Sequence, residues 1–495
     1  MKTMKIPFAV AAAALIALPA SIDAQPSTRV FMAGAATSNI TPPLGCEILG
    51  GWDPKFATHI HDELHARCLV LDDGATRLVF AVVDNVGIPR ETFDAAKRLI
   101  HDATGVPLDH MLMSSTHTHS AAKVGGVSAG SGSKPRPSAA ACEPGSAAGG
   151  ERWSYEAFLI QRIADGVRRA INNLEPARIG WGACQVPQHV FNRRWLLKDG
   201  KTGVNPLGGA DRAVMNPGFG RDDLLKPAGP TNSEVYFVSV QSIDGRPIAL
   251  LANYWLHYVG RVGNGHISAD YFGAFCDRIQ QLLGADRQEL PFVGILANGP
   301  CGDVNNNNYN ATQEEYAPYE KIRLVADDVA QAVLEEHKNI RHLDWVELKA
   351  AHSELTLKMR RPTPEHLRRA EQVLARPATV SPIHIREVNY ARLLLAIKDW
   401  PESLTIVLQA FRIGDLGIAA VPFEAFTETG LEIKARSPFK DTFTIELANG
   451  EHGYLPTPGQ HELGGYETWL GINRVDKEAS RTVVAELLKL FERLK

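Results

Sequence analysis

The sequence predicts an α/β fold in which a layered core of mixed β-sheet is flanked by helices, with an α+β arrangement as the alternative. Short apolar runs typical of buried strands recur along the chain. Between them lie segments whose apolar residues repeat at helical spacing. Several strand-like runs end in clusters of polar residues, and α/β folds place their functional sites at such strand ends.

Seven apolar runs define the expected strands. They occupy residues 68–71, 78–83, 110–113, 235–241, 248–252, 292–296 and 418–421. Helical spacing of apolar residues predicts helices at residues 90–102, 155–173, 271–283, 319–336, 363–376, 386–399 and 476–494. Strands that alternate with helices are more typical of a layered enzyme than of a β-sandwich.

The first 24 residues have the composition of a secretory signal peptide. Lys2 and Lys5 precede an apolar run at residues 6–19, and small residues follow before Gln25. The run is too short to span a bilayer, and no later run approaches the ~20 apolar residues of a transmembrane helix. The sequence therefore predicts export, to the periplasm or out of the cell, and no transmembrane span.

Residues 25–495 are expected to form one large domain with a sizeable core. Residues 125–151, rich in Gly, Ser, Ala and Pro, are expected to form a flexible loop within it. The net charge of −4 and the absence of a long basic run argue against nucleic acid as a partner. The six cysteines form no CxxC pair, so they indicate neither a zinc knuckle nor a particular disulfide pairing. Composition specifies no oligomeric state.

Two histidines end the apolar run at residues 111–120, which reads MLMSSTHTHS. In an extended strand, side chains two residues apart point to the same face. The imidazoles of His117 and His119 would then leave the strand end on one side. This geometry suits a metal ligand with a second histidine beside it for substrate or proton work. Two purely structural histidines are the alternative.

Catalytic zinc takes three or four protein ligands from His, Asp, Glu and occasionally Tyr. His257 ends another apolar run, and Glu424 lies in the apolar stretch VPFEAF, where an unpaired acid is costly. Tyr454 and His452 lie in a polar turn at residues 449–457. Each residue also has an ordinary structural alternative. His257 could be a core histidine, Glu424 an ion-paired acid, and Tyr454 and His452 part of a surface turn.

A loop rich in Gly and Asn follows the apolar run at residues 292–296. It reads ANGPCGDVNNNN at residues 297–308. Free backbone N–H groups in such a loop would suit an oxyanion, whereas an ordinary turn is the alternative.

Together these segments resemble the neutral/alkaline, non-lysosomal ceramidases, zinc-dependent amidases that split the N-acyl bond of ceramide. THTHS at residues 116–120 matches the family outright. AGAATSNITP at residues 33–42 resembles the family's opening segment, and IHDELHAR at residues 60–67 resembles its IHxxLxAR segment. The resemblance covers residues 30–475 in patches, and it implies the family's catalytic fold and bound Zn²⁺.

The resemblance also implies the zinc ligands. The family's two histidines fall on His117 and His257, its glutamate on Glu424 in a PFE turn, and its tyrosine on Tyr454 in YLPT. His119 is then expected to stabilise an oxyanion or to shuttle a proton.

Three further residues receive supporting roles. Arg193, in a segment that resembles the family's NRS, is expected to face the site and orient the substrate or balance charge. Asp84 and Asp303 are expected to orient the ligand histidines from behind.

The chain departs from the family pattern in two places. The family's GDxSPN loop carries a serine proposed to act in catalysis, whereas GDVNNN at residues 302–307 places Asn305 there. An amide cannot act as a nucleophile, but it can donate a hydrogen bond to an oxyanion. The family's C-terminal β-sandwich domain is also expected to have no counterpart after Glu467. The resemblance therefore implies fold and metal more strongly than substrate.

The sequence thus predicts an exported zinc-dependent hydrolase in which zinc-activated water attacks a carbonyl, foremost that of an N-acyl amide. The expected partner is a small-molecule, lipid-like or glycan-like acylated substrate. An esterase, a deacetylase or a glycan-directed hydrolase is the enzymatic alternative. A binding protein that keeps the metal without turnover is the alternative of another class, which the missing serine motivates. A scaffold with structural histidines and no metal is the third.

Overall fold

The computed structural model describes residues 1, 29–49, 55–125, 154–377 and 379–495. The signal peptide predicted at residues 1–24 lies, apart from Met1, outside the described residues. The loop predicted at residues 125–151 lies outside them too, apart from Gly125.

An eight-stranded mixed sheet forms the centre of the fold, in the order β19-β17-β16-β9-β1-β5-β6-β7. Its strands are β1 (Met32–Asn39), β5 (His65–Asp72), β6 (Arg77–Val83), β7 (Met111–Ser115), β9 (Glu175–Gln185), β16 (Glu234–Ser242), β17 (Pro247–Tyr254) and β19 (Val293–Asn298). The pairs β6–β7 and β17–β19 are parallel, and the other pairs are antiparallel. β1 and β9 share only two residue pairs, so the sheet consists of two four-stranded halves.

A second, four-stranded sheet has the order β21-β22-β23-β25. Its strands are β21 (Leu348–Lys358), β22 (Ser403–Ile413), β23 (Leu416–Ala420) and β25 (Asp441–Ile445). Phe80 of β6 and Phe411 of β22 meet edge to face between the sheets, with ring centroids 5.3 Å apart. One apolar cluster contains residues of both sheets, which shows that they pack face to face.

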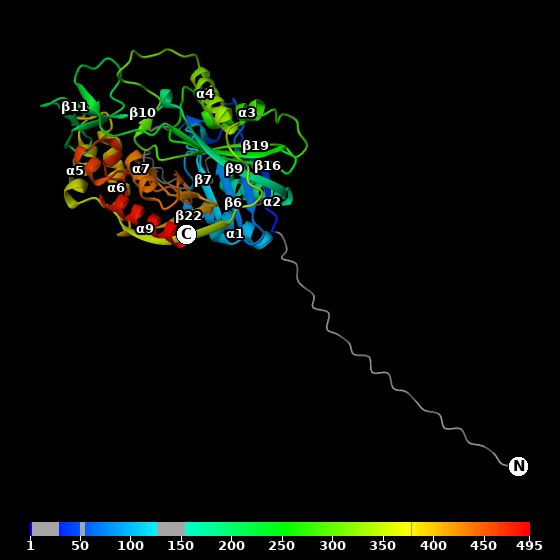
Figure 1. Cartoon of the computed structure of the whole chain (residues 1–495). Helices are drawn as coiled ribbons and strands as arrows, with labels where there is room; N and C mark the ends of the chain where they lie inside the picture. Colours follow the sequence, from blue (N-terminus) through cyan, green and yellow to red (C-terminus); the bar gives the residue numbers. More distant parts are fainter. Residues whose placement is uncertain (2–28, 50–54, 126–153, 378) are drawn as a thin grey trace, which may run out of the picture.

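The nine α-helices of the described residues are α1 (Arg90–Thr104), α2 (Tyr155–Asn172), α3 (Asp270–Leu282), α4 (Glu320–His337), α5 (Pro364–Ala375), α6 (Glu387–Ala396), α7 (Thr427–Arg436), α8 (Pro458–Leu463) and α9 (Ala479–Leu494). α1 to α4 cover the outer face of the large sheet, where α3 and α4 lie beside β16 and β19 (Figure 1). α7 and α9 cover the outer face of the small sheet. The result is four layers, helices, sheet, sheet and helices, and it confirms the predicted layered α/β fold.

Short strands complete the described structure. They are β2 (Glu47–Leu49), β3 (Lys55–Phe56), β4 (His59–Ile60), β8 (Ala121–Ala122), β10 (Phe191–Asn192), β11 (Arg194–Leu197), β12 (Gly203–Val204), β13 (Ala210–Asp211), β14 (Ala213–Met215), β15 (Leu224–Pro227), β18 (His266–Ile267), β20 (Val304–Asn305), β24 (Glu424–Ala425) and β26 (Tyr454–Leu455). Within the described ranges, no helix combines the length and the apolar character needed to cross a bilayer.

All seven predicted strands and all seven predicted helices are present, with ends displaced by a few residues. In the two main sheets, the strands β1, β9, β21, β22 and β25 were not predicted. β21 alternates between half-buried and exposed residues, so it lacks a continuous apolar run. β9 carries Gly180 and Gly182, where an added Cβ would lie 2.8 Å from Arg341 O and from a methyl of Ile340, respectively. Glycine is therefore needed at these two positions because neighbouring segments pack closely against them, and not because glycine favours a strand.

Gly34 provides a test of the packing between β1 and α2. A Cβ on Gly34 would lie 2.2 Å from Ala170 O and 2.7 Å from Leu174 N, both backbone atoms. Gly34→Ala should therefore lower the free energy of unfolding by about 1–3 kcal/mol through overpacking, as measured by urea denaturation. Gly459→Ala in α8, where an added Cβ meets nothing within 4 Å, is the matched control and should be neutral or slightly stabilising. Equal stabilities of the two variants would contradict this packing.

Candidate metal centre

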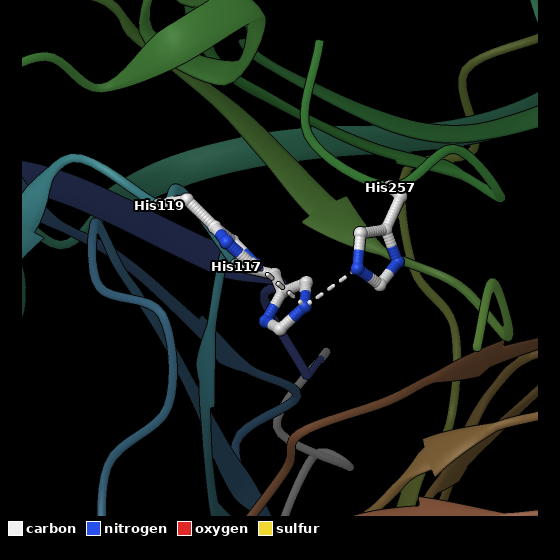
Figure 2. Close-up of side chains that lie close together, drawn as sticks. All are labelled: His117, His119 and His257. Carbon is white, nitrogen blue, oxygen red and sulfur yellow. Dashed lines mark hydrogen bonds between the residues drawn. The ribbon is translucent and has the colours of Figure 1, made fainter. Parts of the chain in front are cut away.

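Three histidines meet where β7 and β17 end (Figure 2). The Nε2 atoms of His117 and His257 are 3.0 Å apart, and those of His119 and His117 are 3.3 Å apart. His117 and His257 are almost fully buried, whereas His119 is half-buried and stacks on Tyr258 at 3.8 Å between ring centroids. The structure thus brings His117 and His119 of the HxH pair together with His257 in a group that could hold a metal ion.

The reason given for that convergence is wrong. β7 ends at Ser115, and His117 has φ of +74°, so the HxH pair is not an extended strand. A left-handed conformation is uncommon outside glycine and needs support from its surroundings. Two carbonyls supply it, because His117 N donates to Asn85 O at 2.8 Å and its Nδ1 donates to Val86 O at 2.6 Å.

These backbone contacts determine which nitrogen of each ligand histidine carries the proton. A carbonyl oxygen can only accept, so Nδ1 of His117 is the protonated nitrogen and its Nε2 presents a lone pair. Nδ1 of His257 likewise donates to Cys301 O at 3.2 Å. Two lone pairs therefore face each other across 3.0 Å. Such a pair is stabilised by a cation between the two nitrogens.

Glu424 brings a third acceptor to the same point. Its Oε2 lies 3.1 Å from His117 Nε2 and 3.7 Å from His257 Nε2. This oxygen is buried and has no hydrogen-bond donor among the described residues. A buried carboxylate oxygen without a donor is costly unless a charge compensates it. The local structure fixes this carboxylate, because Glu424 in β24 pairs in parallel with Tyr454 in β26.

The separations of these atoms fit a metal ion. Zinc bonds of about 2.1 Å arranged tetrahedrally place neighbouring ligand atoms about 3.4 Å apart. The three observed separations are 3.0, 3.1 and 3.7 Å. His117, His119 and His257 also form a group whose ligand atoms all lie within 4.8 Å, which could hold a metal ion. His119, expected only to act in catalysis, therefore also lies within ligand range.

Burial keeps the imidazoles available as ligands. It lowers the pKa of His257 well below its usual value, and the nearby His117 and Arg193 lower it further. The pKa of His119 is lowered in the same direction by the same three causes. Both rings are therefore neutral at pH 7, which is the state that binds a metal.

Tyr454 and Arg193 close the site on one side. Tyr454 is 8 % exposed, and burial raises the pKa of its phenol well above the usual value, so the hydroxyl is protonated. The Arg193 guanidinium lies 5.3 Å from the centroid of the Tyr454 ring. Its Nη1 is 3.2 Å from His257 Nε2, and its Nε donates to Glu467 Oε1 at 2.9 Å. Arg193 thus faces the site, as the sequence predicted.

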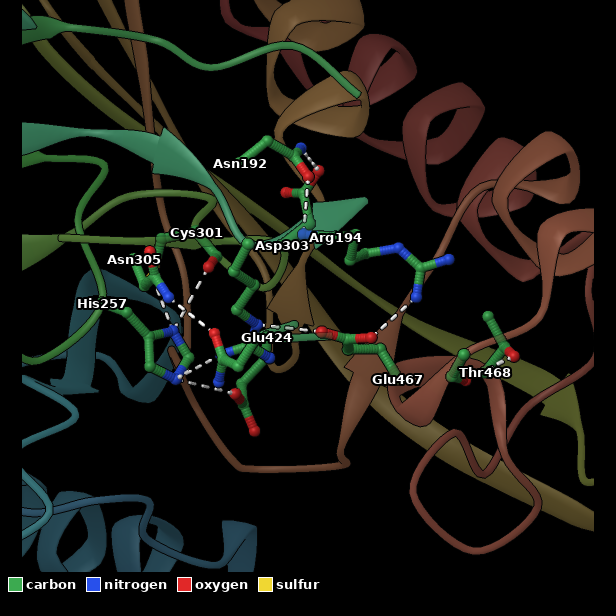
Figure 3. Close-up of polar contacts among 12 residues, drawn as sticks. Asn192, Arg194, His257, Cys301, Asp303, Asn305, Glu424, Glu467 and Thr468 are labelled. Carbon is green, nitrogen blue, oxygen red and sulfur yellow. Dashed lines mark hydrogen bonds and ion pairs between the residues drawn. The ribbon is translucent and has the colours of Figure 1, made fainter. Parts of the chain in front are cut away.

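Asn305 lies near His257, but its amide is engaged elsewhere (Figure 3). Nδ2 donates to Asn216 Oδ1 at 2.6 Å and to the Tyr309 hydroxyl at 3.3 Å. Its Oδ1 accepts from Asn307 N at 2.9 Å. The oxyanion role assigned to Asn305 stays a prediction.

The two aspartates do not orient the ligand histidines. Asp84 pairs with Arg67, with Nη1 and Oδ2 2.5 Å apart. Asp303 accepts from the amide of Asn192 at 2.8 Å and from the backbone and hydroxyl of Thr427 at 2.9 Å. Backbone carbonyls of Val86 and Cys301 do the orienting instead. Asp303 holds the loop after β19 against α7.

Glu446 is a supporting residue that the sequence analysis missed. Its side chain is fully buried, and Oε2 accepts from Cys301 N at 3.2 Å and from Ala425 N at 2.9 Å. Its Oε1 lies 3.0 Å from Cys301 Sγ. Burial raises the pKa of Glu446 well above its usual value. Glu446 thus links two segments of the site. One is the loop that orients His257, and the other is the strand that carries Glu424. The signal was present, since Glu446 follows a buried strand just as Glu424 does.

Fold and site together define a layered α/β protein with a buried histidine cluster able to hold a metal ion. The fold is that of neutral ceramidase. The crystal structure of neutral ceramidase from Pseudomonas aeruginosa matches with a TM-score of 0.66 and 16% identity, over 94% of this chain and 74% of that chain. The structure of ceramidase complexed with C2 matches with a TM-score of 0.65 and 16% identity, over 94% and 75%. No protein-family model matches the sequence.

Replacing Glu446 tests whether it joins the two halves of the site. Glu446→Ala leaves the buried N–H groups of Cys301 and Ala425 without an acceptor, at about 1–3 kcal/mol each. We expect lower stability in urea and about 10- to 100-fold weaker zinc binding in competition with a chelator. Glu446→Gln keeps a carbonyl acceptor and should stay close to wild type. Wild-type zinc affinity in Glu446→Ala would remove Glu446 from the support of the site.

Proposed function

We propose that this chain is an exported zinc-dependent hydrolase that cleaves an N-acyl amide in an acylated lipid-like substrate. One observation carries the proposal. The unprotonated Nε2 atoms of His117 and His257 face each other at 3.0 Å with an unpartnered Glu424 oxygen beside them. Two imidazoles, a carboxylate and the Tyr454 phenol make the nitrogen and oxygen donor set that zinc prefers.

In this proposal, different residues of the chain have different roles. A zinc ion held by these atoms supplies the Lewis acid that polarises a carbonyl and makes water nucleophilic near neutral pH. His119, neutral and partly exposed, can accept a proton from water and return it to the leaving amine. Arg193 presents an Nη2 that is buried and has no acceptor among the described residues, which suits a developing oxyanion.

The amide interpretation is preferred over a glycan-directed one because the asparagine run is already occupied. Asn305 binds Asn216 and Tyr309, and the amide of Asn306 donates to Tyr258 O and Val259 O at 3.2 and 3.1 Å. These amides therefore do not form a free polar wall for sugar hydroxyls. The shared fold with proteins named as ceramidases supports an N-acyl substrate.

Histidine variants separate the ligand role from the catalytic role. His117→Ala should reduce zinc from about one per chain to near zero and abolish turnover, as measured by elemental analysis and a panel of N-acyl lipids, N-acyl sugars and simple esters. His119→Ala should keep its zinc and lose about 10²–10⁴-fold in kcat. His352→Ala, whose side chain is 47 % exposed on β21, is the control and should change neither.

Loss of zinc in His119→Ala to the same extent as in His117→Ala would place His119 among the ligands. Zinc without hydrolysis of any compound in the panel would favour the binding protein. Purified protein that takes up no metal would reject the proposal.

The pH dependence of zinc retention follows from the lowered pKa values of His119 and His257. A proton competes with the metal for Nε2, and burial disfavours the protonated rings. Zinc content after dialysis should therefore be unchanged at pH 6.5 and fall only at clearly more acidic pH. Half-loss of zinc near pH 6.5 would show that the rings behave as exposed histidines.

A further inference from the structure

A cavity of about 270 Å³ lies outside the histidine cluster, on the other side of the turn that carries Tyr454. Its apolar walls are Met359, Leu393, Trp400 and Leu404, from β21, α6, β22 and the segments that follow. His452 and Arg474 complete its lining. The volume is near the lower limit of ~300 Å³ for small-molecule sites. It equals roughly nine times the ~30 Å³ share of a water molecule in the liquid.

Arg474 supplies a cation that is only loosely paired, with Glu451. Its side chain is 16 % exposed, and its hydrogen bond to Glu451 Oε2 is long, at 3.5 Å. Its Nε is buried and has no acceptor among the described residues. The guanidinium lies over Trp400, with Cζ 5.9 Å from the ring centroid. A guanidinium has five N–H donors and binds carboxylates most strongly, so this one has unused capacity.

His452 adds a second polar group beside the same cavity. It is 9 % exposed, and its Nε2 is buried without a hydrogen-bond partner among the described residues. Its ring packs against Phe423 at 5.8 Å between centroids. The cavity thus combines apolar walls with one cation and one imidazole. This combination fits a molecule with a short apolar body and a single anionic end.

We propose that this cavity binds a small amphipathic carboxylic acid, with its carboxylate at Arg474 and its apolar body against Trp400, Leu393 and Leu404. The carboxylate accepts from the guanidinium, and the apolar body leaves water for the walls of the cavity. Binding needs neither the metal nor turnover.

The position of the cavity connects its occupant to the metal centre. Gly453 lies between His452 and Tyr454, and Gly453 O accepts from Glu424 N at 3.0 Å. Gly453 N donates to Glu451 Oε1 at 2.8 Å, and Glu451 also contacts Arg474. A ligand that orders Arg474 and His452 therefore orders the turn that positions two expected zinc ligands. This connection rests on the proposed function. Hydrolysis of an N-acyl amide by water yields a carboxylate and an amine, so the acid product belongs to the ligand class.

Octanoate, with ten heavy atoms, is the probe. Binding to the whole chain is measured by isothermal titration calorimetry, with zinc and after chelation, and 1-octanol is the uncharged comparison. Arg474→Met removes the charge and keeps most of the packing. Leu404→Trp fills the cavity from β22, and Leu374→Trp on the exposed face of α5 is the matched control.

We expect octanoate to bind wild type and Leu374→Trp equally, with or without zinc. Arg474→Met, Leu404→Trp and the use of octanol should each weaken binding about 10- to 100-fold.

Three results would overturn the proposal. Octanoate that fails to bind wild type at about 10 mM would leave the cavity as a hydrated gap. Binding that both variants retain would place the ligand elsewhere. Binding that chelation abolishes and Leu404→Trp leaves intact would place the carboxylate on the metal. None of these results depends on hydrolysis, so failure of the proposed function is recognised separately by the absence of turnover.

Discussion

The contact between two unprotonated imidazole nitrogens, His117 Nε2 and His257 Nε2, constrains the rest of the site. Each ring uses its Nδ1–H on a backbone carbonyl, so neither can place a proton between the two nitrogens. A third acceptor, Glu424 Oε2, faces the same point. Charged rings would remove the repulsion, but burial lowers the pKa of His257 well below its usual value. The site therefore directs several lone pairs at one point, where a cation can bind, and protons cannot easily take the place of that cation.

The choice of backbone carbonyls as hydrogen-bond partners has a chemical consequence. A carboxylate behind a ligand histidine would raise the basicity of the ring more than a neutral carbonyl does. Here the carboxylates of Asp84 and Asp303 are used for structure, by Arg67 and by Asn192 and Thr427. His257 is therefore held firmly, and burial keeps it weakly basic. Under the proposed function, a metal bound by such a ring would remain strongly electrophilic.

Much of this could be predicted from the sequence, because continuous apolar runs and acids or histidines at their ends are local signals. His117, His257 and Glu424, three of the four expected ligands, lie together although they are far apart in the chain. The left-handed φ of His117 was not predictable, since its cause is a pair of carbonyls from another strand end. Glu446 and β21 were missed for related reasons. The role of Glu446 depends on which buried N–H groups meet it, and β21 is only half covered.

The resemblance to the ceramidases places a serine where this chain has Asn305, and the hydrogen bonds of Asn305 give it a structural role there. Asn305 occupies the corresponding position but spends its amide donors on Asn216 and Tyr309, so it fixes the loop rather than offering a reactive group. In the proposed function, His119 and Arg193 are then the polar groups that act beside the histidines. Glu467 holds Arg193 through Nε, and it is itself held by Arg194 at 2.7 Å. That anchoring leaves Nη2 of Arg193 free to meet negative charge on a carbonyl oxygen, where a fixed donor is most effective because it needs no reorganisation.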